Sequence, residues 1–229
     1  EIAQCLVGSE MCIRDRLCSY GILDAGKTAV IEMSGAAGIT LLSETERNPL
    51  YTTTYGVGEV IRDAIARGCR HFIIGIGGSA TNDGGIGMLQ ALGFDLLDQE
   101  GVPVRHGALG LRDLAVISDS HVLPELKECT FRIACDVTNP LCGPQGCSAV
   151  FGPQKGADSA MIQQMDQWLS SYAALARKSF PETNPAHAGA GAAGGLGFAF
   201  LTFFHATLES GVNIILEETH LSDYIKNAD

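Results

Sequence analysis

Short apolar runs bounded by glycine, proline and polar residues alternate along the chain with stretches in which apolar residues recur every three or four positions. The run at 72–76 is rich in β-branched residues and predicts a buried strand, as does the run at 131–135. The runs at 29–33 and 94–97 predict two more strands. Because helical stretches separate these strands, the pattern predicts an α/β fold with βα units around a mostly parallel sheet.

Helices are predicted where the apolar spacing follows the helical repeat. Apolar residues from Val57 to Ile65 share one side of a helix that Gly68 ends. A long helix, capped by Asp158 or Ser159, carries a core-facing stripe at steps of three and four. Further helices are expected at 86–92, 109–114, 198–207 and 214–225.

A glycine-rich turn at 77–85 joins the strand at 72–76 to the helix at 86–92. The first N–H groups of a helix lack internal partners and carry partial positive charge, so such a turn favours an anion. Asp83 can hold a proton or a metal ion and is predicted to be catalytic. The predicted substrate-binding residues of this turn are Gly77, Gly78, Ser79, Thr81 and Asn82. A tight turn without a ligand is the alternative.

Two further clusters place polar side chains near predicted element ends. Asp136 and Asn139 follow the strand at 131–135, and ligands of open α/β sheets gather at the carboxyl ends of strands. Lys155 lies in the loop before the long helix, where a cation and free N–H groups suit a phosphate. We therefore predict that Asp136 and Lys155 are catalytic and that Asn139 binds substrate. An Asx turn before Pro140 and a solvated surface lysine are the alternatives.

Residues 21–28 match the P-loop pattern G-x-x-x-x-G-K-T in full. That pattern has a phosphate-binding meaning only between a strand and a following helix. Here the residues on both sides are strand-like, so residues 24–26 are predicted to form the turn of a β-hairpin.

A second glycine-rich tract, at 189–197, would pass a loose search for a dinucleotide-binding site. No predicted strand precedes it, so close helix packing and ligand binding explain it equally well. A nucleotide-dependent oxidoreductase would also require a ribose-binding acid ~20 residues after the first glycines. Asp95 and Asp98 lie at that distance, within a strand and a turn.

Composition narrows the classes of partner. The 229-residue chain has a net charge of −11, so a nucleic-acid backbone would be repelled. An acidic enzyme that binds an anion must supply local positive charge or recruit Mg²⁺. The eight cysteines are irregularly spaced, which predicts reduced thiols in the cytoplasm and no structural metal. The longest apolar run, at 196–204, is shorter than the ~20 residues needed to span a bilayer.

Residues 1–16 follow neither a strand nor a helix period. Their run VGSEMCIRDR is similar to translated adapter sequence, so we interpret 1–16 as a non-native leader and expect the fold at 17–229. An ordinary irregular N-terminus is the alternative.

Several of these segments resemble the bacterial-type glycerate kinases. The matching segments, in the family's order, lie at 27–33 (KTAVIEM), 52–56 (TTTYG), 75–85 (GIGGSATNDGG), 136–141 (DVTNPL), 151–156 (FGPQKG) and 189–195 (GAGAAGG). The resemblance implies a two-domain α/β enzyme with its site in a cleft between the domains. It also implies that this chain is a truncated, central fragment, because the family's N-terminal Asp-Ser-Phe-Lys and later Thr-Gly-Glu-Gly-Arg segments are missing.

The function that this resemblance implies is phosphorylation of D-glycerate by ATP with Mg²⁺, giving 2-phosphoglycerate. Such a transfer needs positioning and charge neutralisation more than covalent chemistry. The amides of 77–85 would hold the carboxylate or a phosphate, Asp83 or Asp136 would take the hydroxyl proton or bind Mg²⁺, and Lys155 would neutralise phosphate charge. The alternatives are the oxidoreductase and a non-catalytic fragment. Nucleic acid and membranes are not expected partners.

Overall fold

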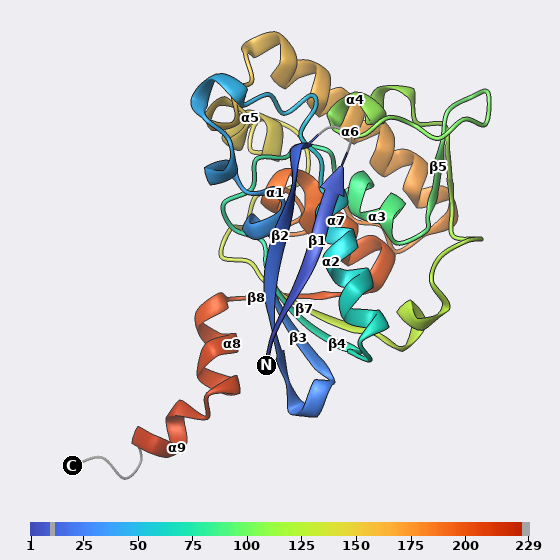
Figure 1. Cartoon of the computed structure of the whole chain (residues 1–229). Helices are drawn as coiled ribbons and strands as arrows, with labels where there is room; N and C mark the ends of the chain where they lie inside the picture. Colours follow the sequence, from blue (N-terminus) through green and yellow to red (C-terminus); the bar gives the residue numbers. More distant parts are fainter. Residues whose placement is uncertain (10–11, 226–229) are drawn as a thin grey trace.

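A six-stranded sheet forms the centre of the structure, a computed structural model that describes residues 1–9 and 12–225 (Figure 1). The strand order is β1-β2-β3-β4-β7-β8. The strands are β1 (Ile2–Ser9), β2 (Cys12–Leu23), β3 (Thr28–Glu32), β4 (His71–Gly75), β7 (Thr130–Ala134) and β8 (Thr207–Glu209). Strands β3, β4, β7 and β8 run parallel, while β1 and β2 are antiparallel additions at one edge. The predicted α/β fold with a mostly parallel sheet is confirmed.

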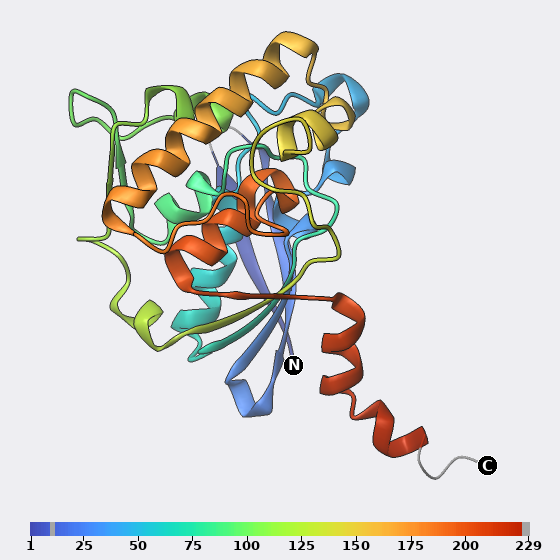
Figure 2. The ribbon, with the colours of Figure 1, turned by 180° about the vertical axis from the view of Figure 1, so that it is seen from behind.

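The helices pack around this sheet as the apolar spacing predicts. Figure 2 shows α6 and α7 on the side of the molecule opposite the β1–β2 pair, and α2 packs against α3 and β1. The helices are α1 (Ser34–Ala37), α2 (Tyr55–Ala66), α3 (Ile86–Ala91), α4 (Ala108–Asp113), α5 (Cys147–Phe151), α6 (Ser159–Ser179), α7 (Ala192–Phe204), α8 (Gly211–Glu218) and α9 (Leu221–Ile225). Asp158 caps α6 by accepting a hydrogen bond from the Met161 amide, as predicted.

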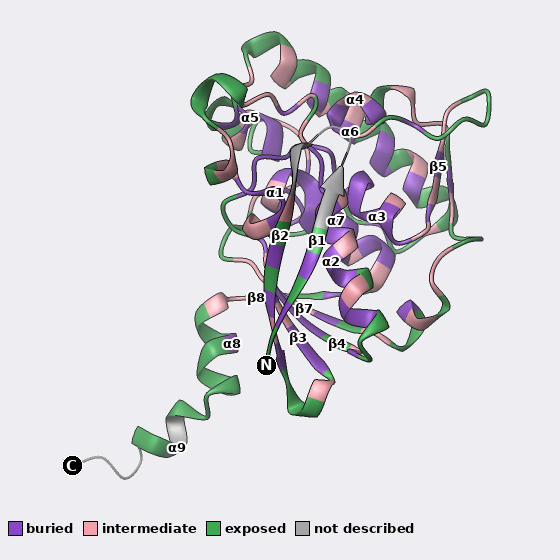
Figure 3. Ribbon diagram, in the orientation of Figure 1, coloured by how far each residue is buried: buried purple, intermediate pink, exposed green. Residues whose placement is uncertain are grey.

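Aromatic rings join the sheet to the helices behind it. Phe72 of β4 stacks on Phe131 of β7 with a centroid distance of 4.9 Å, and Phe131 contacts Phe200 and Phe204 of α7. These rings are part of one continuous apolar core, which occupies the centre of the molecule in Figure 3. The core fixes the carboxyl ends of β4 and β7 side by side, because residues 71–75 pair in register with 130–134.

Three element predictions were wrong. Residues 2–9 and 12–16, expected to lack an element, lie in β1 and β2, which pair between Ile2 and Gly21 and between Cys5 and Cys18. Thr207, assigned to the end of the helix at 198–207, instead begins the edge strand β8, which was not predicted. The helix expected at 214–225 is divided into α8 and α9, which project from the body (Figures 1 and 2).

The strand at 94–97 pairs outside the central sheet. Strand β5 (Asp95–Leu97) and the unpredicted β6 (Val116–Ser118) form a separate antiparallel pair. The expected second domain and the interpretation of residues 1–16 as non-native stay predictions. None of the helices in the described chain combines the length and apolar character needed to cross a bilayer.

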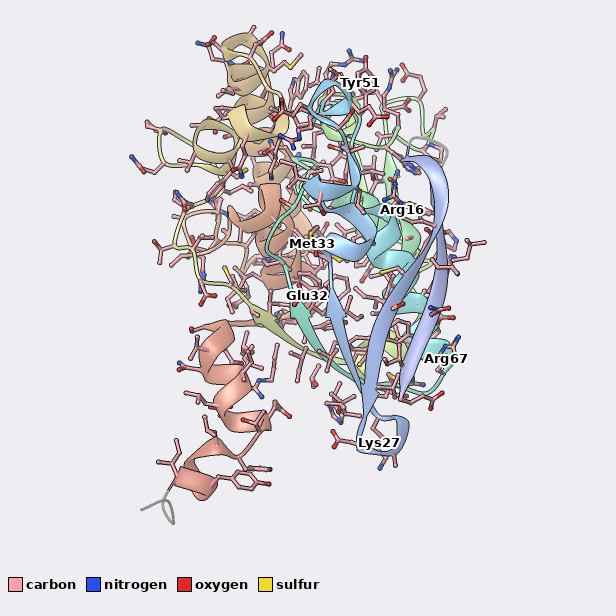
Figure 4. All side chains as sticks on the ribbon, turned by 60° about the vertical axis from the view of Figure 1, so that its left-hand side comes forward. Arg16, Lys27, Glu32, Met33, Tyr51 and Arg67 are labelled. Carbon is pink, nitrogen blue, oxygen red and sulfur yellow. The ribbon has the colours of Figure 1, made fainter. Side chains whose placement is uncertain are left out.

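The P-loop match is a hairpin, as predicted. Residues 24–26 form a short 3-10 turn between antiparallel β2 and β3, and β3 follows Lys27 where a P-loop would have a helix. Figure 4 shows Lys27 at the opposite end of β3 from Glu32 and Met33. Lys27 is therefore remote from the sheet edge at which the parallel strands end.

Candidate active site

A cavity of about 240 Å³ lies at the carboxyl ends of β4 and β7, where the sheet topology places ligands. Its walls come from the loops that follow these two strands and from the segments around α5 and α7. The lining residues are Ile76, Gly77, Gly78, Ser79, Ala134, Cys135, Asp136, Val137, Phe151, Gln154, Lys155, Ala192 and Ala193. We call this space the first cavity. It brings together two of the three predicted catalytic residues and three of the six predicted substrate-binding residues.

The loop after β4 presents unpaired amides to the first cavity. The N–H groups of Gly77, Gly78 and Ser79 have no hydrogen-bond acceptor in the described part of the chain. Two backbone hydrogen bonds hold this loop against the segment around α1. The Ile39 amide donates to the Gly78 carbonyl (2.8 Å), and the Ala80 amide donates to the Ala37 carbonyl (2.9 Å). Gly78 has a φ of +69°, a left-handed conformation that side chains disfavour. Successive free amides in such a turn form a concave site for an anion.

Lys155 fixes the far side of the same loop. It lies in a 3-10 turn, Pro153–Lys155, and only 2% of its surface is exposed. Its Nζ donates to Ser79 Oγ (2.8 Å) and to the Thr81 carbonyl (2.7 Å). Lys155 therefore lies at the site, but it is buried and donates to protein groups. The alternative of a solvated surface lysine is wrong. Burial lowers the pKa of Lys155 to about 8.

The ammonium also determines what the Ser79 hydroxyl can do. A lysine ammonium only donates hydrogen bonds, so Ser79 Oγ must accept from Lys155. The hydroxyl hydrogen is then directed elsewhere, and both residues line the first cavity. The loop therefore offers the amides of 77–79 and the Ser79 hydroxyl as donors, with a cation behind them.

The lowered pKa of Lys155 predicts a pH dependence of stability. In the unfolded chain this lysine has an ordinary pKa of ~10.4, so above pH 8 it keeps its proton there while the folded chain loses it. The contribution of Lys155 to the free energy of unfolding therefore rises with pH from about 8. We expect the free energy of unfolding of the parent, minus that of Lys155→Met, to rise by about 1 kcal/mol between pH 8 and 9. Urea titrations at both pH values measure this difference. A constant difference would contradict it, and Lys178→Met is the exposed control.

Asp136 also lines the first cavity, from the loop after β7. The residue is exposed, and its Oδ1 accepts hydrogen bonds from Ser210 Oγ (2.9 Å) and the Gly211 amide (3.2 Å). Its Oδ2 has no hydrogen-bond partner among the residues that the structure describes. These contacts fix one carboxylate oxygen and leave the other available in the wall of the cavity.

Asp83 does not line this cavity, so its predicted catalytic role stays a prediction that its position does not support. It has no exposed surface, and its Oδ2 accepts from the Thr54 amide (2.8 Å) and Thr54 Oγ1 (2.9 Å). Its Oδ1 accepts from the Gly85 amide (3.1 Å), and Thr54 Oγ1 accepts from the Met88 amide (3.0 Å). Burial raises the pKa of Asp83, while these donors oppose that shift. The carboxylate therefore joins the N-terminal ends of α2 and α3.

Three predicted substrate-binding residues also lie outside the first cavity. Asn82 is buried and donates to Ser148 Oγ (2.9 Å), and Asn139 donates to the Gln145 carbonyl (2.9 Å). The Thr81 side chain is buried, and only its carbonyl contacts Lys155. The turn at 77–85 therefore has two parts: Gly77 and Gly78 are exposed, whereas residues 79–85 are buried.

The second glycine-rich tract packs against the buried half of that turn. The Gly84 amide donates to the Gly194 carbonyl (2.9 Å), and a Cβ on Gly194 would lie 2.0 Å from the Thr81 carbonyl oxygen. Close packing therefore requires glycine here. The adjacent Ala192 and Ala193 line the first cavity, so the tract also shapes the site. Sequence reasoning missed Gln154, although it adjoins Lys155, and Ser210, for which no signal was present.

The structure also bears on a metal site and on the oxidoreductase alternative. Within residues 1–9 and 12–225 there is no group of three or more His, Cys, Asp and Glu side chains that could hold a metal ion. Asp95, one candidate for the ribose-binding acid, accepts from His121 Nδ1 (2.7 Å) on the separate β5–β6 pair. No feature of the described chain favours an oxidoreductase.

Comparisons with known proteins agree with this architecture. The model of the "Glycerate kinase family" matches residues 5–229. The chain is 47% identical over 210 residues to a glycerate kinase of Haemophilus influenzae, covering 92% of this chain and 56% of the relative. It is 48% identical over 207 residues to glycerate 2-kinase of Escherichia coli, covering 90% of this chain and 54% of the relative.

A crystal structure provisionally named glycerate kinase 2, from Salmonella typhimurium LT2, superimposes with a TM-score of 0.95 at 43% identity. That match covers 100% of this chain and 61% of the solved chain. The chain thus spans about half the length of the curated relatives that it matches. The chain belongs to the glycerate kinase family.

Proposed function

We propose that this chain supplies the acceptor site of an ATP-dependent kinase that phosphorylates D-glycerate, most simply at the 2-hydroxyl. The single observation that supports it is the row of unpaired amides at 77–79, which lines one small cavity together with Lys155 and Asp136. A space of about 240 Å³ suits a three-carbon acid, because it is smaller than the ~300–1,000 Å³ of sites for larger ligands.

The roles follow from the donors and acceptors of the first cavity. The amides of Gly77 and Gly78 and the Ser79 hydroxyl bind the glycerate carboxylate, because an anion satisfies donors that otherwise lack partners. Lys155 holds that loop and adds positive charge behind it. Asp136 Oδ2 accepts the proton of the attacking hydroxyl.

In the reaction, the glycerate hydroxyl oxygen forms a new bond to the γ-phosphorus of ATP. The bond from that phosphorus to the bridging oxygen breaks, ADP leaves with the electron pair, and the hydroxyl proton goes to Asp136. Asp136 is also the described residue that would hold Mg²⁺, in place of taking the proton, and the ion would neutralise phosphate charge when bound; a magnesium ion needs only one or two carboxylates beside the phosphates. A cytoplasmic location stays a prediction.

Titration with D-glycerate tests the carboxylate site directly. We expect Ser79→Ala to weaken D-glycerate binding about tenfold, as expected from the loss of one charge-assisted hydrogen bond of ~1.4 kcal/mol. Isothermal calorimetry on the chain measures the affinity, and a thermal melt shows whether the variant is folded. Ser170→Ala, at an exposed position on α6, is the matched control and should bind like the parent.

If Ser79→Ala binds glycerate as tightly as the parent, the carboxylate does not occupy the loop. Phosphorus NMR of the product made by a full-length family member then identifies the phosphorylated hydroxyl. A product carrying phosphate at the 3-position would contradict the proposed regiochemistry and leave the carboxylate site unaffected.

A further inference from the structure

A second and larger cavity, of about 380 Å³, lies against the same loop. The segment after α1, the loop that carries residues 48–53, and Ala80 and Thr81 form its walls. Apolar lining residues include Ala37, Leu41, Leu42, Tyr51 and Ala80. Tyr51 lines the cavity and is 46% exposed, so its side chain is accessible to a ligand. We call this space the second cavity.

The first and second cavities share one rigid partition. The hydrogen bonds from Ile39 to Gly78 and from Ala80 to Ala37 join the segment after α1 to the loop after β4. Gly77–Ser79 faces the first cavity, and Ala80 and Thr81 face the second. The Thr81 carbonyl also accepts from Lys155, which lines the first cavity. Ligands in the two cavities would therefore lie on either side of the same short segment.

The chemistry of the second cavity differs from that of the first. Its walls are mostly methyl and leucine side chains, with the Tyr51 ring and a few polar groups such as Asn48 and Thr52. Among the described lining residues, Arg16 is the only cation and Glu46 the only anion, so the wall offers no cluster of positive charge for a phosphate. The Thr52 hydroxyl already donates to the Ala80 carbonyl (2.8 Å). Such a space suits a flat, uncharged and partly apolar group.

We infer that the second cavity binds the nucleoside part of the phosphoryl donor, with the base against the Tyr51 ring and the leucines. This inference rests on the proposed function, because a kinase must hold a nucleotide beside its acceptor. The first cavity is the smaller of the two, and its unpaired amides suit a small anion. Figure 4 shows Tyr51 and Arg16 toward the end of the sheet where β3 ends at Glu32, away from Lys27. That is the end at which the acceptor site also lies.

Adenosine is the appropriate probe, because it lacks phosphates and so reports the nucleoside contacts alone. Saturation-transfer NMR and calorimetry on the chain should show adenosine binding that Tyr51→Ala weakens about tenfold, through loss of the aromatic face. Leu42→Arg, which places a charge at a half-buried wall position, should weaken binding at least as much. Tyr224→Ala removes a 75% exposed tyrosine on α9 and is the matched control; it should bind adenosine like the parent.

Two further measurements separate this inference from the proposed function. Asp136→Asn, which alters only the first cavity, should leave adenosine binding within twofold of the parent, and D-glycerate should not displace adenosine. No adenosine binding, unchanged binding in both Tyr51→Ala and Leu42→Arg, or competition by D-glycerate would each overturn the nucleoside site. Failure of D-glycerate to bind while adenosine binding still depends on Tyr51 would overturn the acceptor site and leave the second cavity as a nucleoside site.

Discussion

Asp136→Asn should lower the turnover of a full-length glycerate kinase about 100-fold when introduced at the matching position. The substitution keeps the shape of the side chain, and the amide oxygen can still accept from Ser210 and Gly211. What is lost is the available carboxylate oxygen, which takes the hydroxyl proton in the proposed reaction. An amide cannot accept that proton, so the chemical step should be slowed while the KM for D-glycerate changes little.

The measurement is steady-state turnover coupled to ADP release, with a thermal melt of each variant. Asp119→Asn, at an exposed position outside the first cavity, is the control and should keep parental turnover. Turnover of Asp136→Asn within a few-fold of the parent, in a folded enzyme, would show that Asp136 is not the proton acceptor.

The central part of the fold could be predicted from the sequence because its signals are local. Strands β4 and β7 are apolar runs between turn residues, and α2 and α6 carry a clear helical spacing. The hairpin was predictable for the same reason, since strand-like residues flank Lys27 on both sides. Elements that depend on distant partners were missed. Strand β8 is three residues long and becomes a strand only by pairing with β7.

The same distinction between local signals and distant packing applies to the candidate site. The sequence identified the loop with Gly77, Gly78 and Ser79, together with Asp136 and Lys155, because each follows a strand or precedes a helix. It could not separate Asp136 from Asp83. Both are aspartates after a buried strand, but the side chain of Asp83 is enclosed by α2 and α3, and that packing has no local signal. The burial of Lys155 depends likewise on the loop that folds over it, not on its own neighbours in the chain.

Asp83→Ala should destabilise the protein by about 3 kcal/mol, since it leaves several buried donors without an acceptor. The Asp83 carboxylate accepts from the Thr54 amide, the Thr54 hydroxyl and the Gly85 amide at a site with no exposed surface. Asp83→Asn should also destabilise, because its amide group would face one of these N–H donors. Urea unfolding, with the slope unchanged, measures the loss.

The control for this prediction is Asp119→Ala, which removes an exposed carboxylate and should change the free energy of unfolding by less than ~0.5 kcal/mol. If Asp83→Ala also costs less than ~1 kcal/mol, the hydrogen bonds to Thr54 and Gly85 do not hold α2 and α3 together. Asp83 would then be free to act elsewhere, and the catalytic assignment first given to it would have to be reconsidered. A large loss of stability, with Asp136 controlling turnover, would instead show that two aspartates after buried strands serve separate purposes: one closes the ends of two helices, and the other acts on substrate.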